Sequence, residues 1–218
     1  MTRMLLALEG GAGAGKSTLR DWLLSAVAAR GIPAGHVGQF SWLSLPATRA
    51  LIKLRSGTPA PTAAQALAAA RRDLELHTRY NIFPALDHGP VIADRLILST
   101  ASLLALVHDG PVDSYVRALA EVADARPDLT VLVTTPPEVC HGRLHGRETA
   151  RRFGEDQETA ARLAGLCSQA ASAWTAATGL PVLRNPCTTA TDLEELGTAC
   201  LARLGIASLP TTQAEELP

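Results

Sequence analysis

Short apolar segments alternate along the chain with longer stretches that have helical character. The apolar segments are residues 4–8, 36–40, 90–93, 129–133 and 180–184. Residues 16–29 have the spacing of an amphipathic helix, residues 62–85 indicate a long helix, and another helix is expected to begin at residue 136 with proline in its first turn. Alternation of this kind is typical of parallel βαβ units. The pattern predicts an α/β protein whose parallel sheet carries helices on both faces.

A glycine-rich segment follows the first predicted strand directly. It has the form G-x-x-x-x-G-K-S and consists of Gly10, Gly11, Ala12, Gly13, Ala14, Gly15, Lys16 and Ser17, with Thr18 next. Glycines in such a turn let consecutive backbone N–H groups surround phosphate oxygens, and the following helix points its positive end at the same anion. The lysine reaches the β- and γ-phosphates, and the serine hydroxyl can bind Mg²⁺. The segment predicts an ATP-binding phosphate loop (P-loop) of the NTPase type, with Mg²⁺ as cofactor.

The amino-acid composition argues against some classes of function but does not by itself indicate one. The 218 residues are 47% hydrophobic and 19% charged, as in globular proteins, and the net charge of −1 argues against a sequence-independent grip on nucleic acid. No apolar run approaches the ~18–20 residues that a membrane helix needs. The four cysteines are scattered, which fits free thiols in a reducing compartment. We therefore expect a cytoplasmic protein whose partners are small molecules rather than nucleic acid polymers or membranes.

Two charged residues, Asp94 and Arg95, follow the third predicted strand. In open α/β sheets, functional residues gather at the carboxyl ends of the strands. A carboxylate there can hold Mg²⁺ or accept the proton of an acceptor hydroxyl, and an arginine can bind phosphate bidentately. An ordinary surface ion pair is the alternative. We predict that both residues are catalytic and that Asp94 joins Ser17 at the metal, whereas Glu9 either orients water there or is structural.

Three segments, in this order, resemble the thymidylate kinase family of P-loop kinases. They are residues 8–18, the V-I-A-D-R of residues 91–95, and residues 126–139, with P-D-L-T, an apolar run and P-P-E. The resemblance extends over roughly residues 4–184 and implies a kinase domain, to which we assign residues 1–207. Residues 208–218 are polar and bounded by proline, so we expect them to form a loose tail. The resemblance further implies that the protein transfers the γ-phosphate of ATP to a deoxynucleoside monophosphate such as dTMP or a close analogue. Members are typically dimers, so a homodimer is expected.

The resemblance also implies a helical lid at about residues 141–156, a region rich in arginine. An arginine brought in by lid closure stabilises the negative charge that spreads over a phosphoryl group in transfer. The variable positions of the P-loop carry no basic residue, which in the family goes with a basic lid. We expect Arg147 and Arg151 to be the catalytic lid arginines, and a solvated charged helix is the alternative.

The acceptor side departs from the family pattern. Ala12 stands where the family has an acidic residue near the sugar, and Leu67 replaces a phenylalanine that stacks on thymine, while Arg71 keeps the base-reading arginine. The family's R-E-P-G segment is absent, and Phe40 and Arg49 lie in its region as expected acceptor contacts. Two alternatives stay open: a kinase for another small hydroxylated metabolite, such as a modified nucleoside or an antibiotic-like molecule, and a non-enzymatic nucleotide-binding regulatory module.

Overall fold

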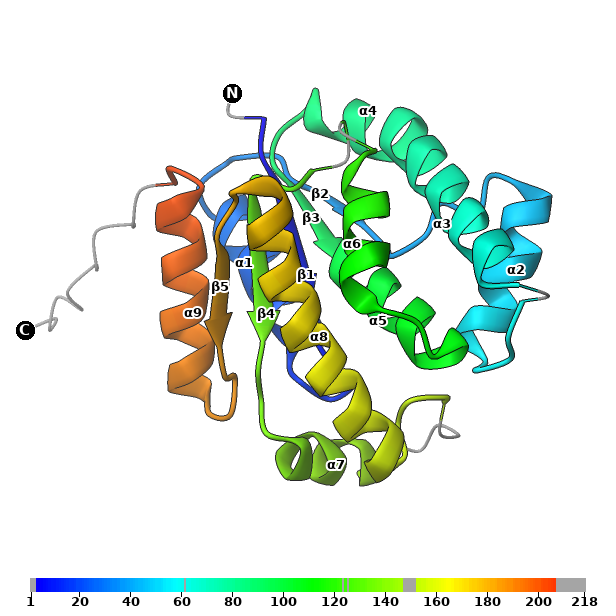
Figure 1. The fold of residues 1–218 in the computed structure, drawn as a ribbon. Coiled ribbons are helices and arrows are strands. Elements are labelled where there is room, and N and C mark those ends of the chain that lie inside the picture. Colours follow the sequence, from blue (N-terminus) through cyan, green and yellow to red (C-terminus); the bar gives the residue numbers. More distant parts are fainter. Residues whose placement is uncertain (1–2, 61, 123, 125, 147–151, 207–218) are drawn as a thin grey trace, which may run out of the picture.

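Five parallel strands form one sheet in the order β2-β3-β1-β4-β5 (Figure 1). The computed structural model describes residues 3–60, 62–122, 124, 126–146 and 152–206. The strands are β1 (Leu5–Glu9), β2 (Gly35–Val37), β3 (Val91–Asp94), β4 (Leu129–Val133) and β5 (Val182–Asn185). The predicted α/β fold of the P-loop NTPase type is confirmed.

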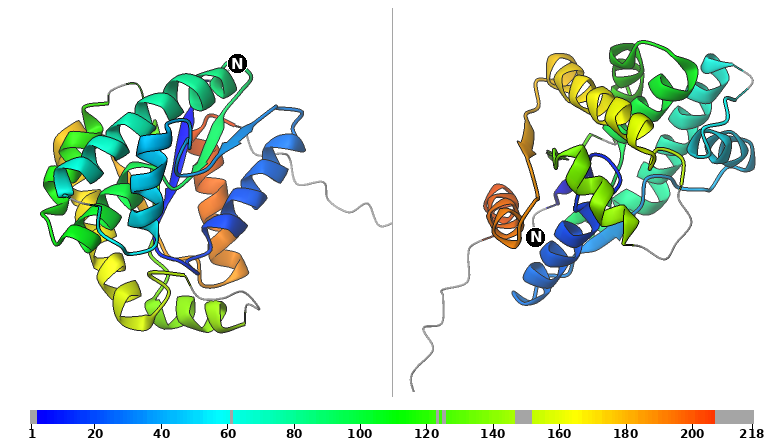
Figure 2. Two further views of the ribbon diagram at one scale, coloured as in Figure 1. Left: turned by 90° about the vertical axis from the view of Figure 1, so that its right-hand side faces the viewer. Right: turned by 90° about the horizontal axis from the view of Figure 1, so that it is seen from below.

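Helices cover both faces of this sheet (Figures 1 and 2). One face is covered by α1 (Lys16–Ala28) and α9 (Ala190–Arg203). The other face is covered by α2 (Leu45–Arg55), α3 (Ala63–His77), α4 (Phe83–Leu86), α5 (Ile97–His108), α6 (Val112–Ala120) and α8 (Gln157–Thr178). Helix α7 (Pro137–His145) follows β4 beyond the carboxyl edge of the sheet.

Successive residues of β1 serve opposite faces of the sheet. Leu5 and Ala7 belong to the core beneath α5, α6 and α8, whereas Leu6 and Leu8 belong to the core beneath α1 and α9. All five residues of β1 are buried, as expected for a central strand covered on both sides. The carboxyl end of β1, where the P-loop begins, is therefore anchored in two cores at once.

The second strand is shorter than the predicted segment 36–40. After Val37 the chain leaves the sheet because its polar groups bond to helices instead: Gly38 O accepts a hydrogen bond from His77 Nε2 (2.8 Å), and Gln39 Nε2 donates to Thr100 Oγ1 (3.2 Å). These bonds carry the chain from the sheet toward α3 and α5.

The predicted long helix over residues 62–85 contains a local irregularity. Thr62 caps α3, since its side chain accepts the backbone N–H of Gln65 (3.1 Å), and a π-helical turn, η1 (Thr78–Ile82), joins α3 to α4. Such π turns are frequent at functional sites. Here the turn follows directly on His77, the residue that holds the chain after β2.

The described part of the chain bears on two further expectations, which concern membrane helices and cysteines. No helix in it is long and apolar enough to cross a membrane. The four cysteines are free and buried. The tail over residues 208–218 lies outside the described residues.

Candidate active site: a phosphate-binding cavity

Residues 10–15 link β1 to α1 in a turn that requires glycine. The φ angles of Gly10 and Gly13 are +131° and +77°, and a Cβ at either position would lie 2.6 Å from a carbonyl oxygen, of Val133 and Cys140 respectively. Gly15, at φ +104°, occupies the N-cap of α1. Side chains are excluded here by backbone conformation and by close approach of β4 and α7.

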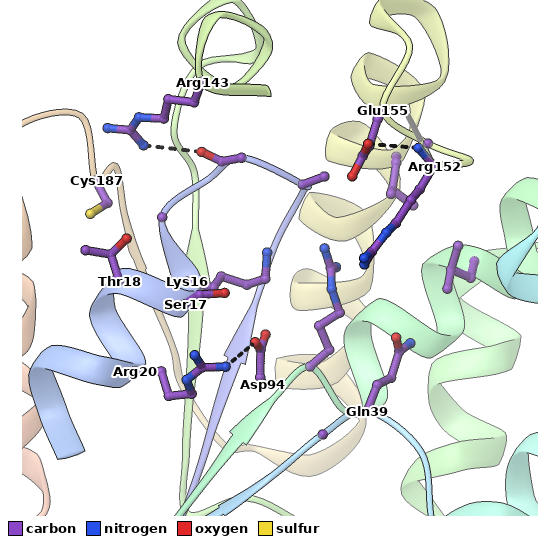
Figure 3. A pocket seen from close by; sticks show the side chains of 18 of the residues that line it. Lys16, Ser17, Thr18, Arg20, Gln39, Asp94, Arg143, Arg152, Glu155 and Cys187 are labelled. Atoms are coloured by element: carbon purple, nitrogen blue, oxygen red, sulfur yellow. Dashed lines mark hydrogen bonds and ion pairs between the residues drawn. The ribbon is translucent and has the colours of Figure 1, made fainter. Parts of the chain in front are cut away.

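The P-loop is braced by two neighbouring segments. Thr135 Oγ1, just after β4, donates to the carbonyl of Ala14 (2.7 Å) and accepts a backbone N–H from the segment after β5 (2.9 Å). Arg143 of α7 donates to the carbonyls of Gly13 (3.3 Å) and Thr188 (2.8 Å) (Figure 3). The loop is therefore held in shape by the protein itself.

Lys16 is a buried cation at the start of α1. Its side chain is 5% exposed, and Nζ donates to the carbonyl of Gly11 (2.5 Å). Burial, with a smaller contribution from the like charge of Arg95, lowers the pKa of Lys16 to about 7. No carboxylate within the described residues forms an ion pair with it. A phosphate bound in the loop would supply the missing negative charge.

Asp94 reaches this loop because of strand register. In the sheet Asp94 of β3 is opposite Leu8 of β1, so its carboxylate lies beside the start of α1 (Figure 3). Arg20, one turn after Lys16, donates to Asp94 Oδ2 (3.2 Å) and also pairs with Asp21 (2.8 Å). The Arg20 guanidinium therefore holds the Asp94 carboxylate at the wall of the cavity.

Ser17 and Asp94 are a donor set that suits Mg²⁺. Both line the cavity with oxygen atoms, and Mg²⁺ is usually held by one or two carboxylates, water and substrate phosphates rather than by an all-protein cage. The described residues contain no group of three or more His, Cys, Asp and Glu side chains placed to hold a metal ion. The residues present fit a magnesium ion that is shared with bound phosphate.

Glu9 has a structural place in this edge of the sheet. It is 1% exposed, and its carboxylate accepts the backbone N–H groups of Leu96 (3.1 Å), Leu98 (3.0 Å) and Ser99 (2.9 Å) as well as the Ser99 hydroxyl. These bonds satisfy the first N–H groups of α5 and complement its positive end. Of the two roles considered for Glu9, the geometry favours the structural one.

Replacing Glu9 with alanine is expected to lower the free energy of unfolding by roughly 2–4 kcal/mol, because several buried donors lose their acceptor. Denaturant unfolding measures the effect. Glu138→Ala removes an exposed carboxylate in the first turn of α7 and is the control, with an expected change within about 0.5 kcal/mol. Equal stability of Glu9→Ala and the parent protein would contradict the structural role.

Arg95 adopts a conformation that is unfavourable for a residue with a side chain. Its φ is +71°, and Nη1 donates to the carbonyl of Gly10 (2.6 Å) and to Ser99 Oγ (3.2 Å). Backbone strain of this kind persists where the surroundings fix it, often at functional sites. Here it places a guanidinium against the P-loop.

These elements enclose a cavity of about 730 Å³ along the carboxyl edge of the sheet (Figure 3). Its walls come from the P-loop and the start of α1, the chain after β2, the ends of α2 and β3, and segments 152–155 and 187–190. The predicted site residues that line it are Ala12, Gly13, Gly15, Lys16, Ser17, Thr18, Phe40, Asp94 and Arg95. The P-loop, Asp94 and Arg95 are thus brought together.

Other predicted site residues are not brought to this cavity. Arg49 is exposed on α2, Leu67 packs against the core, and Arg71 pairs with Glu121 (2.7 Å). None of these three predicted acceptor contacts lines the cavity. Arg147 and Arg151 lie outside the described residues, and so does the middle of the expected lid.

Sequence reasoning missed a second residue of α3 that, with His77, fixes the chain after β2. Asp73 of α3 is 1% exposed, and its carboxylate accepts the backbone N–H groups of Ser41 (2.8 Å) and Trp42 (3.1 Å) and the Ser41 hydroxyl (2.7 Å). The sequence does contain a signal for Asp73, because its spacing places it on the same buried face of α3 as Ala66, Ala70 and His77. A carboxylate at an apolar position of a helix indicates a specific partner.

Other cavity residues carry little sequence signal. Arg20, Gln39, Arg55 and the segment 187–190 line the cavity but stand in no recognisable motif, whereas Arg152 and Phe153, which also line it, belong to the expected lid. Their positions follow from how distant segments pack.

Comparisons with known proteins agree with this geometry. A family model described as thymidylate kinase matches residues 8–171. The thymidylate kinase of Chromobacterium violaceum is 35% identical over 160 residues, covering 69% of this chain and 72% of that protein. The probable thymidylate kinase of Archaeoglobus fulgidus is 29% identical over 147 residues, covering 66% and 70%. The family match includes Lys16, Asp94 and Arg95.

Proposed function

Because the chain belongs to the thymidylate kinase family, we propose that it transfers the γ-phosphate of ATP to dTMP or a closely related deoxynucleoside monophosphate. The family makes it an ATP-dependent nucleoside monophosphate kinase, and the acceptor and the metal are the finer parts of the proposal. The observation that carries it is the convergence of the P-loop, Asp94 and Arg95 on one cavity.

Donor binding falls to the P-loop. Its backbone N–H groups and the positive end of α1 face the donor phosphates, and Lys16 adds a full charge at the β- and γ-phosphates. The buried site strengthens this interaction because water screens it little. Phosphoryl transfer needs little covalent help, so positioning and charge neutralisation supply most of the rate.

The Ser17 hydroxyl and the Asp94 carboxylate would hold Mg²⁺, with Arg20 orienting the carboxylate. When bound there, the ion supplies neutralisation of negative charge on the donor phosphate oxygens. We assign Arg95 to the acceptor phosphate, and its guanidinium held against the P-loop supports this assignment. Arg147 and Arg151 remain our proposed catalytic lid arginines.

The acceptor end of the site also supports an altered specificity within this chemistry. The methyl group of Ala12 lines the cavity and cannot accept a hydrogen bond from a sugar. A modified nucleotide or another small hydroxylated metabolite is therefore the second candidate acceptor.

The test is ADP formation from ATP and Mg²⁺ with a panel of nucleoside monophosphates, nucleosides and small polyols. We expect turnover with at least one nucleoside monophosphate, and weaker turnover of dTMP than in a typical thymidylate kinase. Turnover of a polyol or nucleoside, with every monophosphate inactive, would refute the leading proposal and favour the metabolite kinase. Binding of ATP without ADP formation in the presence of any acceptor would favour the regulatory module.

We further propose that the protein acts in the cytoplasm and forms a homodimer. The four free buried thiols support the first statement. Membership of a family whose proteins are typically dimers supports the second, and sedimentation measures it.

A further inference from the structure

Trp42 is a strained and partly exposed aromatic residue at the wall of the cavity. Its φ is +59°, a value that a bulky side chain rarely adopts, and it is 40% exposed while lining the cavity. Backbone strain of this kind persists where the surroundings fix it, and it gathers at sites that contact ligands. The indole ring is therefore a candidate ligand contact.

Bonds to a buried carboxylate maintain this conformation. Asp73 accepts the backbone N–H groups of Ser41 (2.8 Å) and Trp42 (3.1 Å), and the Ser41 hydroxyl accepts the backbone N–H of Leu43 (3.2 Å). Phe40 packs against the indole, with ring centroids 5.2 Å apart. The protein itself thus holds the ring in place, so a ligand that lies against it does not have to order it.

The chain after β2 borders the cavity opposite the segment after β5. Figure 3 shows Gln39 on one side of Lys16 and Asp94, and Cys187 on the other. Arg95, which we assigned to the acceptor phosphate, follows β3, the neighbour of β2 in the sheet. The indole therefore lies on the side of the cavity that we assign to the acceptor.

Polar groups of this part of the chain are bonded within the protein. The Gln39 amide donates to a hydroxyl of α5 (3.2 Å), the Gly38 carbonyl accepts a bond from α3 (2.8 Å), and the Ser41 hydroxyl donates to Asp73 (2.7 Å). Arg71 forms its ion pair outside the cavity. Groups engaged in this way contribute little to reading the hydrogen-bonding edge of a base, whereas the indole offers a planar apolar surface.

We propose that Trp42 is a specificity-determining residue that holds the base of the acceptor by stacking rather than by reading its edge. The inference rests on the proposed kinase function and deepens it, because such a site selects monophosphates that carry a planar base and discriminates little between bases. Stacking on an aromatic side chain tolerates any base, since every base has a π-face. Purines, which have the larger rings, then bind at least as tightly as thymine.

The test combines removal of the indole with removal of the base. With the P-loop saturated by Mg·ADP, calorimetry measures the affinity for dTMP, dCMP, dAMP, dGMP and deoxyribose 5-phosphate, which has no base. In the parent protein the four nucleotides are expected to bind roughly tenfold or more tightly than deoxyribose 5-phosphate, as a base–aromatic stack provides. Among the nucleotides, dAMP and dGMP are expected to bind at least as tightly as dTMP.

Trp42→Gly is the decisive variant, because glycine adopts φ +59° without strain. It is expected to bind the nucleotides roughly tenfold more weakly than the parent protein and deoxyribose 5-phosphate equally well. Trp42→Phe keeps an aromatic face and is expected to retain most of the affinity. Tyr80→Ala is the matched control, since Tyr80 is also an exposed ring with an arginine over it but does not line the cavity. No change is expected for this control.

Tryptophan fluorescence reports the stack directly. The other two tryptophans are shielded: Trp174 is buried, and Trp22 packs against Gly197 of α9. A base stacked on Trp42 is expected to quench the emission, so dGMP should quench the parent protein and leave Trp42→Phe unchanged. Melting temperatures establish that each variant is folded.

Four results would overturn the stacking site. They are no measurable binding of any nucleotide to the ADP complex, equal affinity of the parent protein for nucleotides and deoxyribose 5-phosphate, a Trp42→Gly variant that weakens both kinds of ligand equally or neither, and binding of dTMP that is roughly hundredfold tighter than that of every other nucleotide, as edge reading gives. Failure of the proposed function has a different signature: binding of nucleotides that depends on Trp42, without ADP formation from ATP in the presence of any of them.

Discussion

Turnover is expected to fall by roughly 10³-fold or more when Lys16 is replaced with alanine, while the fold is retained. The reason is that one ammonium group faces the β- and γ-phosphates, where negative charge must be stabilised in transfer. Burial lowers the pKa of Lys16 to about 7 although the nearby carboxylates of Asp94 and Glu9 raise it, so a bound phosphate would stabilise the charged form of this lysine. Steady-state ADP formation measures the loss.

Lys53→Ala is the control for this experiment, because it removes an exposed lysine away from the cavity. Unfolding by denaturant establishes that Lys16→Ala is folded. A folded Lys16→Ala protein with activity within about tenfold of the parent would refute the assigned role.

Replacing Asp94 with asparagine is expected to lower kcat by about 10²-fold or more, with a smaller effect on the affinity for ATP. Asparagine has the same shape and can still accept a bond from Arg20, so the change removes charge rather than packing. The loss should therefore fall in the transition state, where the carboxylate supports the metal or the acceptor hydroxyl. Separate measurements of kcat and of ATP binding resolve the two effects.

Asp21→Asn provides the matched control, since Asp21 pairs with the same Arg20 but its side chain is 63% exposed. We expect it to retain nearly full activity. If Asp94→Asn changed ATP affinity and left kcat intact, Asp94 would be a positioning residue and the metal assignment would fail.

The sequence by itself determined the donor half of the site. The P-loop is a contiguous segment whose glycines must satisfy local backbone conformation, so its chemistry is visible in eight consecutive residues. Asp94 and Arg95 could be placed beside it because the carboxyl ends of parallel strands share one edge of the sheet. The apolar pattern predicted all five strands of the described sheet. The central strands β1, β3 and β4 are largely apolar because helices cover both their faces, whereas the edge strands β2 and β5 are only partly buried.

Within that fold, the sequence left the role of Glu9 open. A carboxylate next to a P-loop is equally compatible with orienting water around the metal ion and with a structural role. Tertiary structure favours the structural role, because this side chain accepts three backbone N–H groups, one from the N-cap residue Leu96 and two from the first turn of α5. The partners are about ninety residues away along the chain, so no local pattern reveals them.

The acceptor half was decided by tertiary structure. Arg49 and Arg55 both belong to α2 and look equivalent in the sequence, but six residues place them about 120° apart around a helix of 3.6 residues per turn. Only the docking of α2 against Trp42 and Phe153 brings Arg55 to the cavity. The packing of α3 likewise directs Arg71 to the surface, where it forms an ion pair with Glu121. Local periodicity fixes which residues share a face, whereas the packing of distant segments fixes what that face meets.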